Sequence, residues 1–102
     1  MTILVDSLRD YPDAGLPSDR WCHLASDQGF DELHAFARRL GVPERGFHRD
    51  HYDLPPRGRA RALALGAVAV STRELVERMA GPRGERVRRR SRARCGPGGS
   101  AG

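Results

Sequence analysis

The sequence predicts a small α/β domain with a mostly parallel sheet of three or four strands and about three helices, followed by a disordered, basic C-terminal tail. Short apolar runs alternate with segments of helical periodicity, which is typical of domains whose helices cover a sheet in two or three layers. The apolar runs are continuous rather than alternating, which favours parallel strands that are covered on both faces. Residues 83–102 contain few apolar residues and many Arg, Gly, Pro and Ser, which is typical of disorder. The predicted single domain therefore comprises residues 1–82, and the tail comprises residues 83–102.

The first half of the chain predicts two strands and a helix. Thr2–Val5 is a short, β-prone apolar run. Residues 7–20 are rich in Pro, Gly and polar turn formers and predict a long loop. Trp21–Asp27 is the second predicted strand. A helix is predicted over residues 30–40, because its apolar residues follow the spacing i, i+3, i+4, i+7, at Leu33, Phe36, Ala37 and Leu40.

The second half predicts two more strands and two more helices. His51–Leu54 is a short strand, and the prolines that follow it open a helix over residues 55–65. Ala67–Val70 is predicted as another buried strand. Residues 71–74, with the sequence Ser-Thr-Arg-Glu, match the capping box that begins many helices. The last predicted helix ends near Gly81, which a proline follows.

The basic residues are concentrated at the C-terminal end. Residues 1–82 carry eleven Arg and twelve acidic residues, whereas residues 83–102 carry seven Arg and one Glu. The chain contains no Lys, a sign of biased coding that weakens Arg richness alone as evidence for phosphate binding. Arginines in a tail nonetheless release counterions from a nucleic-acid backbone, which gives weak, sequence-independent binding. The candidates for such contact are Arg88, Arg89, Arg90 and Arg92, and the alternative is a solvated extension without a partner.

The two cysteines and the N-terminal residues indicate an intracellular protein. Cys22 and Cys95 are too far apart in the sequence for a paired-cysteine metal site or a disulfide framework, which fits a reducing compartment. The apolar run within residues 1–6 is too short for a signal peptide or a membrane span. We therefore expect a cytoplasmic protein that makes no membrane contact.

A set of short motifs runs along the whole predicted domain. They are Ile3-Leu4-Val5-Asp6, Trp21-Cys22-His23-Leu24, Asp27, Glu32-Leu33-His34-Ala35-Phe36-Ala37, Gly41, Phe47, His51-Tyr52-Asp53, Gly66-Ala67 and Arg73-Glu74-Leu75. Single short motifs carry little information, but their combination is specific. With this combination, residues from Met1 to about Met79 resemble a bacterial and phage family known as domain of unknown function 4031. The resemblance implies no established activity, substrate, cofactor or catalytic residue.

Titratable residues are densest in residues 47–55, which hold two His, two Asp, one Arg and one Tyr. In parallel α/β sheets, ligands bind beyond the carboxyl ends of the strands, and Asp6 and Asp27 fall at the ends of the first two predicted strands. A period of two also places His23 on the same face as Asp27, and His51 on the same face as Asp53. The candidate ligand-binding residues are Asp6, His23, Asp27, His34, His51, Tyr52 and Asp53.

Three kinds of chemistry fit such a set of side chains. Imidazole nitrogen and carboxylate oxygen can hold a divalent metal, for which His23, His51 and Asp53 are the candidates. A His–Asp pair can instead transfer a proton, because the carboxylate fixes the tautomer of the imidazole. The third alternative is a hydrogen-bonded network that only locks the loops.

The sequence does not identify a ligand, a cofactor or a reaction. We predict a domain whose polar His/Asp rim binds a small ligand or a partner. The alternatives are metal-assisted hydrolysis of a phosphoester and nucleic-acid association through the Arg-rich tail.

Overall fold

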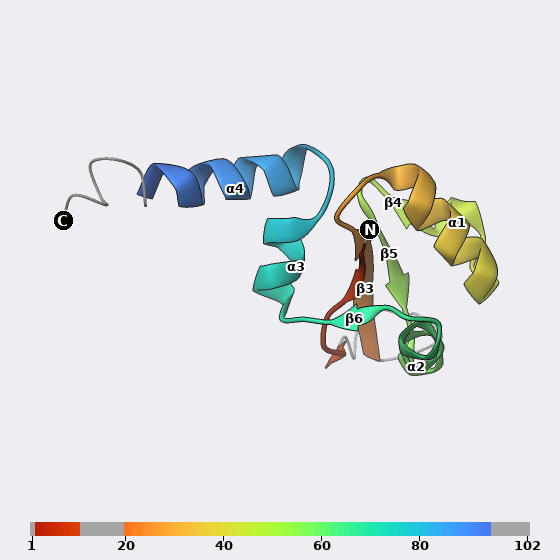
Figure 1. Ribbon diagram of the computed structural model, residues 1–102. Helices are drawn as coiled ribbons and strands as arrows, with labels where there is room; N and C mark the ends of the chain where they lie inside the picture. Colours follow the sequence, from red (N-terminus) through yellow and green to blue (C-terminus); the bar gives the residue numbers. More distant parts are fainter. Residues whose placement is uncertain (1, 11–19, 95–102) are drawn as a thin grey trace.

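The structure is a computed structural model that describes residues 2–10 and 20–94. Within these residues it contains six strands, four α-helices and one short 3-10 helix (Figure 1). The strands are β1 (Ile3–Val5), β2 (Arg9–Asp10), β3 (Arg20–Ser26), β4 (Phe47–His48), β5 (His51–Leu54) and β6 (Val68–Ala69). The helices are α1 (Phe30–Leu40), the 3-10 helix η1 (Glu44–Gly46), α2 (Pro56–Ala64), α3 (Thr72–Arg78) and α4 (Pro82–Arg94).

The sheet is mixed and mostly antiparallel. Its strand order is β4-β5-β3-β1-β6, and β2 also pairs with β3. The β1–β6 pair is parallel, whereas the other pairs in the described residues are antiparallel. The prediction of a mostly parallel sheet with three or four strands was therefore wrong. A parallel pair needs a crossover, usually a helix, and none is found among the described residues between β1 and β3.

The domain has three layers, with α1 and α2 on one face of the sheet and α3 on the other, whereas α4 follows α3 and extends away from the sheet (Figure 1). The predicted apolar stripe of α1 is confirmed, because its four residues are buried on one face of the sheet, where α2 also packs. On the opposite face, Leu75 and Met79 from α3 and the segment after it pack against Leu4 and Ala25. This second core is smaller, and it leaves part of that face to polar side chains.

Helix α3 begins at the predicted position, but only half of the predicted capping box forms. The Oγ atom of Ser71 accepts a hydrogen bond from the backbone N–H of Glu74 at 3.0 Å. The carboxylate of Glu74 instead binds the guanidinium of Arg78 at 2.9 Å. The cap fixes the start of α3, and with it the position of Thr72.

Strand β6 is short and exposed, unlike the buried strand that was predicted. Val68 is 44% exposed, because β6 lies at the edge of the sheet. An apolar run indicates a strand but does not distinguish an edge strand from a central one.

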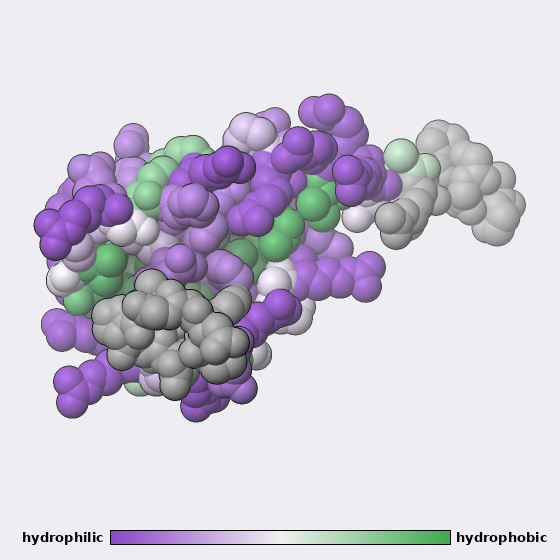
Figure 2. Space-filling view, turned by 180° about the vertical axis from the view of Figure 1, so that it is seen from behind, coloured by the Kyte–Doolittle hydropathy of each residue, from purple (hydrophilic) through white to green (hydrophobic). Residues whose placement is uncertain are grey.

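The prediction of a disordered tail was wrong for residues 83–94, which belong to helix α4; residues 95–102 lie outside the described residues. The Nη1 atom of Arg88 donates to the carbonyl oxygens of Glu77 and Met79, at 2.8 and 2.9 Å. Arg88 therefore caps the end of α3 instead of facing solvent, whereas Arg89, Arg90 and Arg92 are exposed. Figure 2 shows mostly hydrophilic residues over α4 on the face seen from behind. Among the described residues, no helix combines the length and apolar character that a membrane span requires.

Cys22 gives a direct probe of the core. Its side chain is 1% exposed, and burial, assisted by the Asp6 carboxylate, raises the pKa of its thiol to about 12. Because the thiolate is the reactive form, we expect Cys22 in a Cys95→Ser variant to react with a thiol reagent only after unfolding. The rate of labelling is measured by the change in absorbance after addition of a chromogenic thiol reagent, with and without denaturant. Fast labelling of the folded protein would contradict the packing of β3.

Candidate functional site

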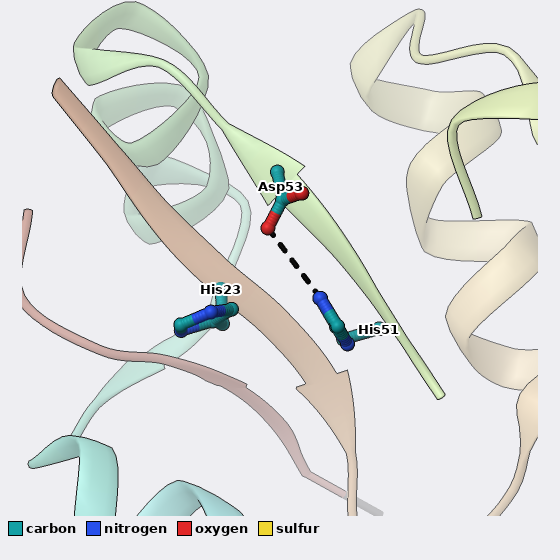
Figure 3. Close-up of side chains that lie close together, drawn as sticks. All are labelled: His23, His51 and Asp53. Atoms are coloured by element: carbon teal, nitrogen blue, oxygen red, sulfur yellow. Dashed lines mark ion pairs between the residues drawn. The ribbon is translucent and has the colours of Figure 1, made fainter. Parts of the chain in front are cut away.

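A cluster of three polar side chains lies on the face of the sheet that α3 covers only in part. His23 comes from β3, and His51 and Asp53 come from β5 (Figure 3). His23 is directly opposite Asp53 in the antiparallel register, and the period of two places His51 on the same face. One nitrogen from each histidine and one oxygen of Asp53 lie within 4.8 Å of one another. The Nε2 atom of His51 is 3.5 Å from Oδ1 of Asp53, and the two imidazole rings are 5.0 Å apart.

The carboxylate of Asp6 fixes the position of the His23 imidazole. The Asp6 side chain is fully buried, and its Oδ2 atom lies 2.7 Å from Nδ1 of His23. Its other oxygen accepts the backbone N–H of His23 at 2.7 Å, and Thr72 donates its hydroxyl to Oδ2 at 2.8 Å. Burial alone would raise the pKa of Asp6, but the hydrogen bonds from His23 and Thr72 outweigh it and lower the pKa. The carboxylate therefore stays ionised although no water reaches it.

Asp50 holds His51 in the same way. It lies in the turn between β4 and β5, and its Oδ1 atom is 2.7 Å from Nδ1 of His51. Arg83 from α4 donates to both oxygens of Asp50, from Nε at 3.1 Å and from Nη2 at 2.9 Å. Burial alone would lower the pKa of His51, but the carboxylates of Asp53 and Asp50 raise it. The hydrogen bond from His51 in turn lowers the pKa of Asp53.

The two histidines are thus oriented alike. In each ring, Nδ1 lies 2.7 Å from an oxygen of a buried carboxylate. A neutral imidazole that donates from Nδ1 keeps the lone pair of Nε2 for another partner. The side chain of His51 is 9% exposed, that of His23 is 27% exposed and that of Asp53 is 51% exposed. Solvent therefore reaches the cluster from the side of Asp53. Two fixed imidazoles beside an accessible carboxylate can bind a metal ion or exchange a proton.

The structure brings Asp6, His23, His51 and Asp53 together, but not the other three candidates. Asp27 lies at the other end of the strands from Asp6, because β3 runs antiparallel to β1. There it accepts the backbone N–H of Thr2 at 2.9 Å and binds Arg78 at 3.4 Å. It therefore joins the N-terminal residues to α3.

His34 and Tyr52 form a separate pair on the other face of the sheet. Tyr52 alternates with His51 and Asp53 along β5, so its ring enters the core beneath α1. Its hydroxyl lies 2.7 Å from Nδ1 of His34, and the ring of Phe47 packs against both. Burial, and then the carboxylate of Glu44, raise the pKa of Tyr52. This pair supports the core and does not line the cluster.

Four residues that complete the arrangement were not predicted from the sequence. Thr72 follows β6, and its contact with Asp6 could have been expected from strand ends that meet at one edge of a parallel pair. Asp50 adjoins His51 in the dense polar stretch. Arg83 had no local signal, because it lies 33 residues from Asp50 and within a run of arginines. Arg59 on α2 donates to the backbone carbonyl of Asp6 at 2.7 Å.

The family comparison covers most of this arrangement. The model of the family described as "Protein of unknown function (DUF4031)" matches residues 3–81. This range includes the three clustered residues and the carboxylates behind both histidines, whereas Arg83 lies outside it. Neither the search of curated proteins nor the search of solved structures gives a match. Because the family model spans well over half of the sequence, the chain belongs to the DUF4031 family.

Proposed function

We propose that this domain binds a divalent transition metal through His23, His51 and Asp53 and acts as a metal-assisted hydrolase. The observation that carries the proposal is the convergence of three potential ligand atoms within 4.8 Å, from two adjacent strands. An oxygen of a buried carboxylate lies 2.7 Å from Nδ1 of each imidazole. Histidines that bind metals usually donate their other N–H to such a group, which orients the ring and raises its basicity.

The separations support a tetrahedral site. A tetrahedron with bonds of about 2.1 Å has edges of about 3.4 Å. The 3.5 Å between Nε2 of His51 and Oδ1 of Asp53 fits such an edge. All three ligand atoms lie within 4.8 Å of one another, roughly 1.4 Å more than that edge, so metal binding requires the side chains to move closer together.

The donor set indicates which metals fit and what they would supply. Two imidazoles and one carboxylate suit Zn²⁺ and similar ions better than Mg²⁺ or Ca²⁺, which prefer oxygen ligands. When bound, such an ion lowers the pKa of a water molecule at its open fourth position and so supplies a nucleophile near neutral pH. The residues of this chain hold the ligands in place, and the exposure of Asp53 leaves a route for water and substrate.

Zinc is expected to stabilise the folded protein. Free Zn²⁺ at about 100 times its Kd should raise the free energy of unfolding by about 2.7 kcal/mol, since the unfolded chain has no preformed site. Thermal unfolding of chelator-treated protein in a zinc series measures this. The same zinc-loaded samples should hydrolyse p-nitrophenyl esters faster than the metal-free protein does.

The variants Asp53→Asn and His51→Ala should remove both effects, because each loses one ligand. The matched control is His48→Ala: this exposed histidine is on the neighbouring strand, its ring 5.6 Å from that of His51, and it is outside the cluster. Its zinc response should equal that of the wild type. If zinc leaves the unfolding of the wild type unchanged, or stabilises Asp53→Asn equally, the cluster is not a metal site and serves only as a polar network.

A further inference from the structure

A basic groove lies between the β4–β5 turn and the first turns of α4. Its volume is about 530 Å³. It adjoins the three-residue cluster, because His51 belongs to both. The residues that line it are His48, Arg49, Asp50, His51, Pro82, Arg83 and Arg86.

Positive charge dominates the wall of this groove. Three arginines and a single carboxylate, that of Asp50, line it. Two of the arginines, Arg49 and Arg86, have no ion pair with any described residue (2–10 and 20–94), and both are exposed. The third, Arg83, uses Nε and Nη2 to bind Asp50, so its guanidinium is held in place while its side chain stays 44% exposed. Held and unpaired guanidinium groups at one groove are suited to a phosphate group, whose oxygens accept several hydrogen bonds at once.

The hairpin turn between β4 and β5 holds the backbone of Arg49 in one conformation. Its φ is +60°, in the left-handed region that residues other than glycine rarely adopt. The backbone N–H of Asp50 donates to the carbonyl of His48 at 2.6 Å, which closes a three-residue γ-turn around Arg49. The contacts of Asp50 with His51 and Arg83 keep this turn in place. A positive φ at the first central residue is the usual geometry of a two-residue hairpin turn, so the turn fixes where the Arg49 side chain begins.

We propose that this groove binds the phosphate group of a phosphoester ligand. Because His51 forms part of both sites, a phosphate held by Arg49 and Arg86 lies next to the proposed metal ligands. As a substrate assignment, this inference rests on the proposed function. As an anion site, it stands on the groove alone and can be tested without metal.

The test is a titration of metal-free protein with inorganic phosphate, followed by the NMR shifts of backbone amides, against NaCl at equal ionic strength. Phosphate should shift the amides of residues 48–51 and 82–86, whereas chloride should not. The variants Arg86→Ala and Arg49→Gly should each weaken phosphate binding about five- to tenfold, because each removes a charged hydrogen-bond donor. The matched control is Arg61→Ala, an exposed arginine on α2, across the sheet; its affinity should equal that of the wild type.

Arg49→Gly separates binding from folding. Glycine adopts a positive φ without strain, so this variant should melt no lower than the wild type while it loses phosphate affinity. A variant with Arg89, Arg90 and Arg92 all changed to alanine should keep wild-type phosphate binding. Loss of binding in that variant but not in Arg49→Gly would place the anion along α4, as in nucleic-acid association, and would overturn the proposal. Equal effects of phosphate and chloride would overturn it as well.

The outcomes for the two sites are independent. Phosphate binding at the groove without any zinc response supports the anion site and removes the proposed metal function. A zinc response without phosphate binding supports the metal site and overturns the phosphate groove.

Discussion

Replacing Asp6 with alanine is expected to lower the free energy of unfolding by about 2–4 kcal/mol. The Asp6 carboxylate is fully buried and accepts hydrogen bonds from the backbone N–H of His23, from its ring and from the hydroxyl of Thr72. Alanine leaves the buried donors without an acceptor, and each such group costs about 1–3 kcal/mol. Denaturant unfolding followed by circular dichroism measures the loss.

The control for this variant is Asp10→Ala. Asp10 is a strand aspartate whose side chain is 80% exposed and whose nearest contact with Arg20 is 3.6 Å, so little change is expected. The effect of Asp6→Ala should also depend on pH. Because the folded protein lowers the pKa of Asp6, its contribution is fully present above the ordinary value of 3.8 and is lost as the pH falls through the folded value. A difference between wild type and variant that grows in acid would contradict this sign.

The milder variant Asp6→Asn tests the same contact for metal binding. An amide keeps an acceptor but loses the charge that orients and polarises the imidazole of His23. Changes of this kind behind a metal ligand typically weaken metal binding about 10- to 100-fold. Competition with a chromogenic chelator measures zinc affinity, and an unchanged affinity would mean that Asp6 only supports the fold.

Gly84→Ala is expected to separate α4 from α3 and to destabilise the protein by about 1–3 kcal/mol. A Cβ atom at position 84 would overlap the carbonyl oxygen of Met79, which is backbone and cannot move away easily. Relief of this overlap pulls α4 outward and breaks the hydrogen bonds of Arg88 to the end of α3. Trypsin should then cleave after Arg88 faster than in the wild type.

The sign of the change in stability distinguishes a steric clash from the effect of helix propensity alone. In a solvated helix, Gly→Ala is stabilising by about 1 kcal/mol, because alanine has the higher helix propensity. Ser91→Ala on the exposed part of the same helix is the control, and it should not destabilise the protein. If Gly84→Ala is also neutral or stabilising, α4 does not pack against α3 in solution.

Local patterns predicted the elements better than their pairing. The helix over residues 30–40 was predicted with its observed bounds, because four apolar residues at helical spacing have only one way to be buried together. Strand direction was wrong, because a continuous apolar run shows that both faces are covered and says nothing about which neighbour pairs with it. In the structure, β3 pairs antiparallel with both β1 and β5.

The candidate site was also predicted only in part, because local patterns do not show which strands pair. Tyr52 was predicted as a candidate together with His51 and Asp53, although the alternation within β5 places it on the opposite face of the sheet. The contact of these residues with His23 depends on a register between strands far apart in the sequence, which no local pattern contains. Arg83 was missed because a run of arginines is usually solvated, and only the turn of the chain after α3 brings it to Asp50.

The contact between Arg83 and Asp50 ties the segment shared by the family to the helix beyond its end. The family match ends at residue 81, yet the guanidinium that secures Asp50, and through it His51, belongs to residue 83. A chain in which a different sequence replaces α4 keeps the Asp6–His23 half and lacks the brace on the other half. A change in the helix that follows the family domain can therefore alter how firmly His51 is held, although every residue within the domain stays the same.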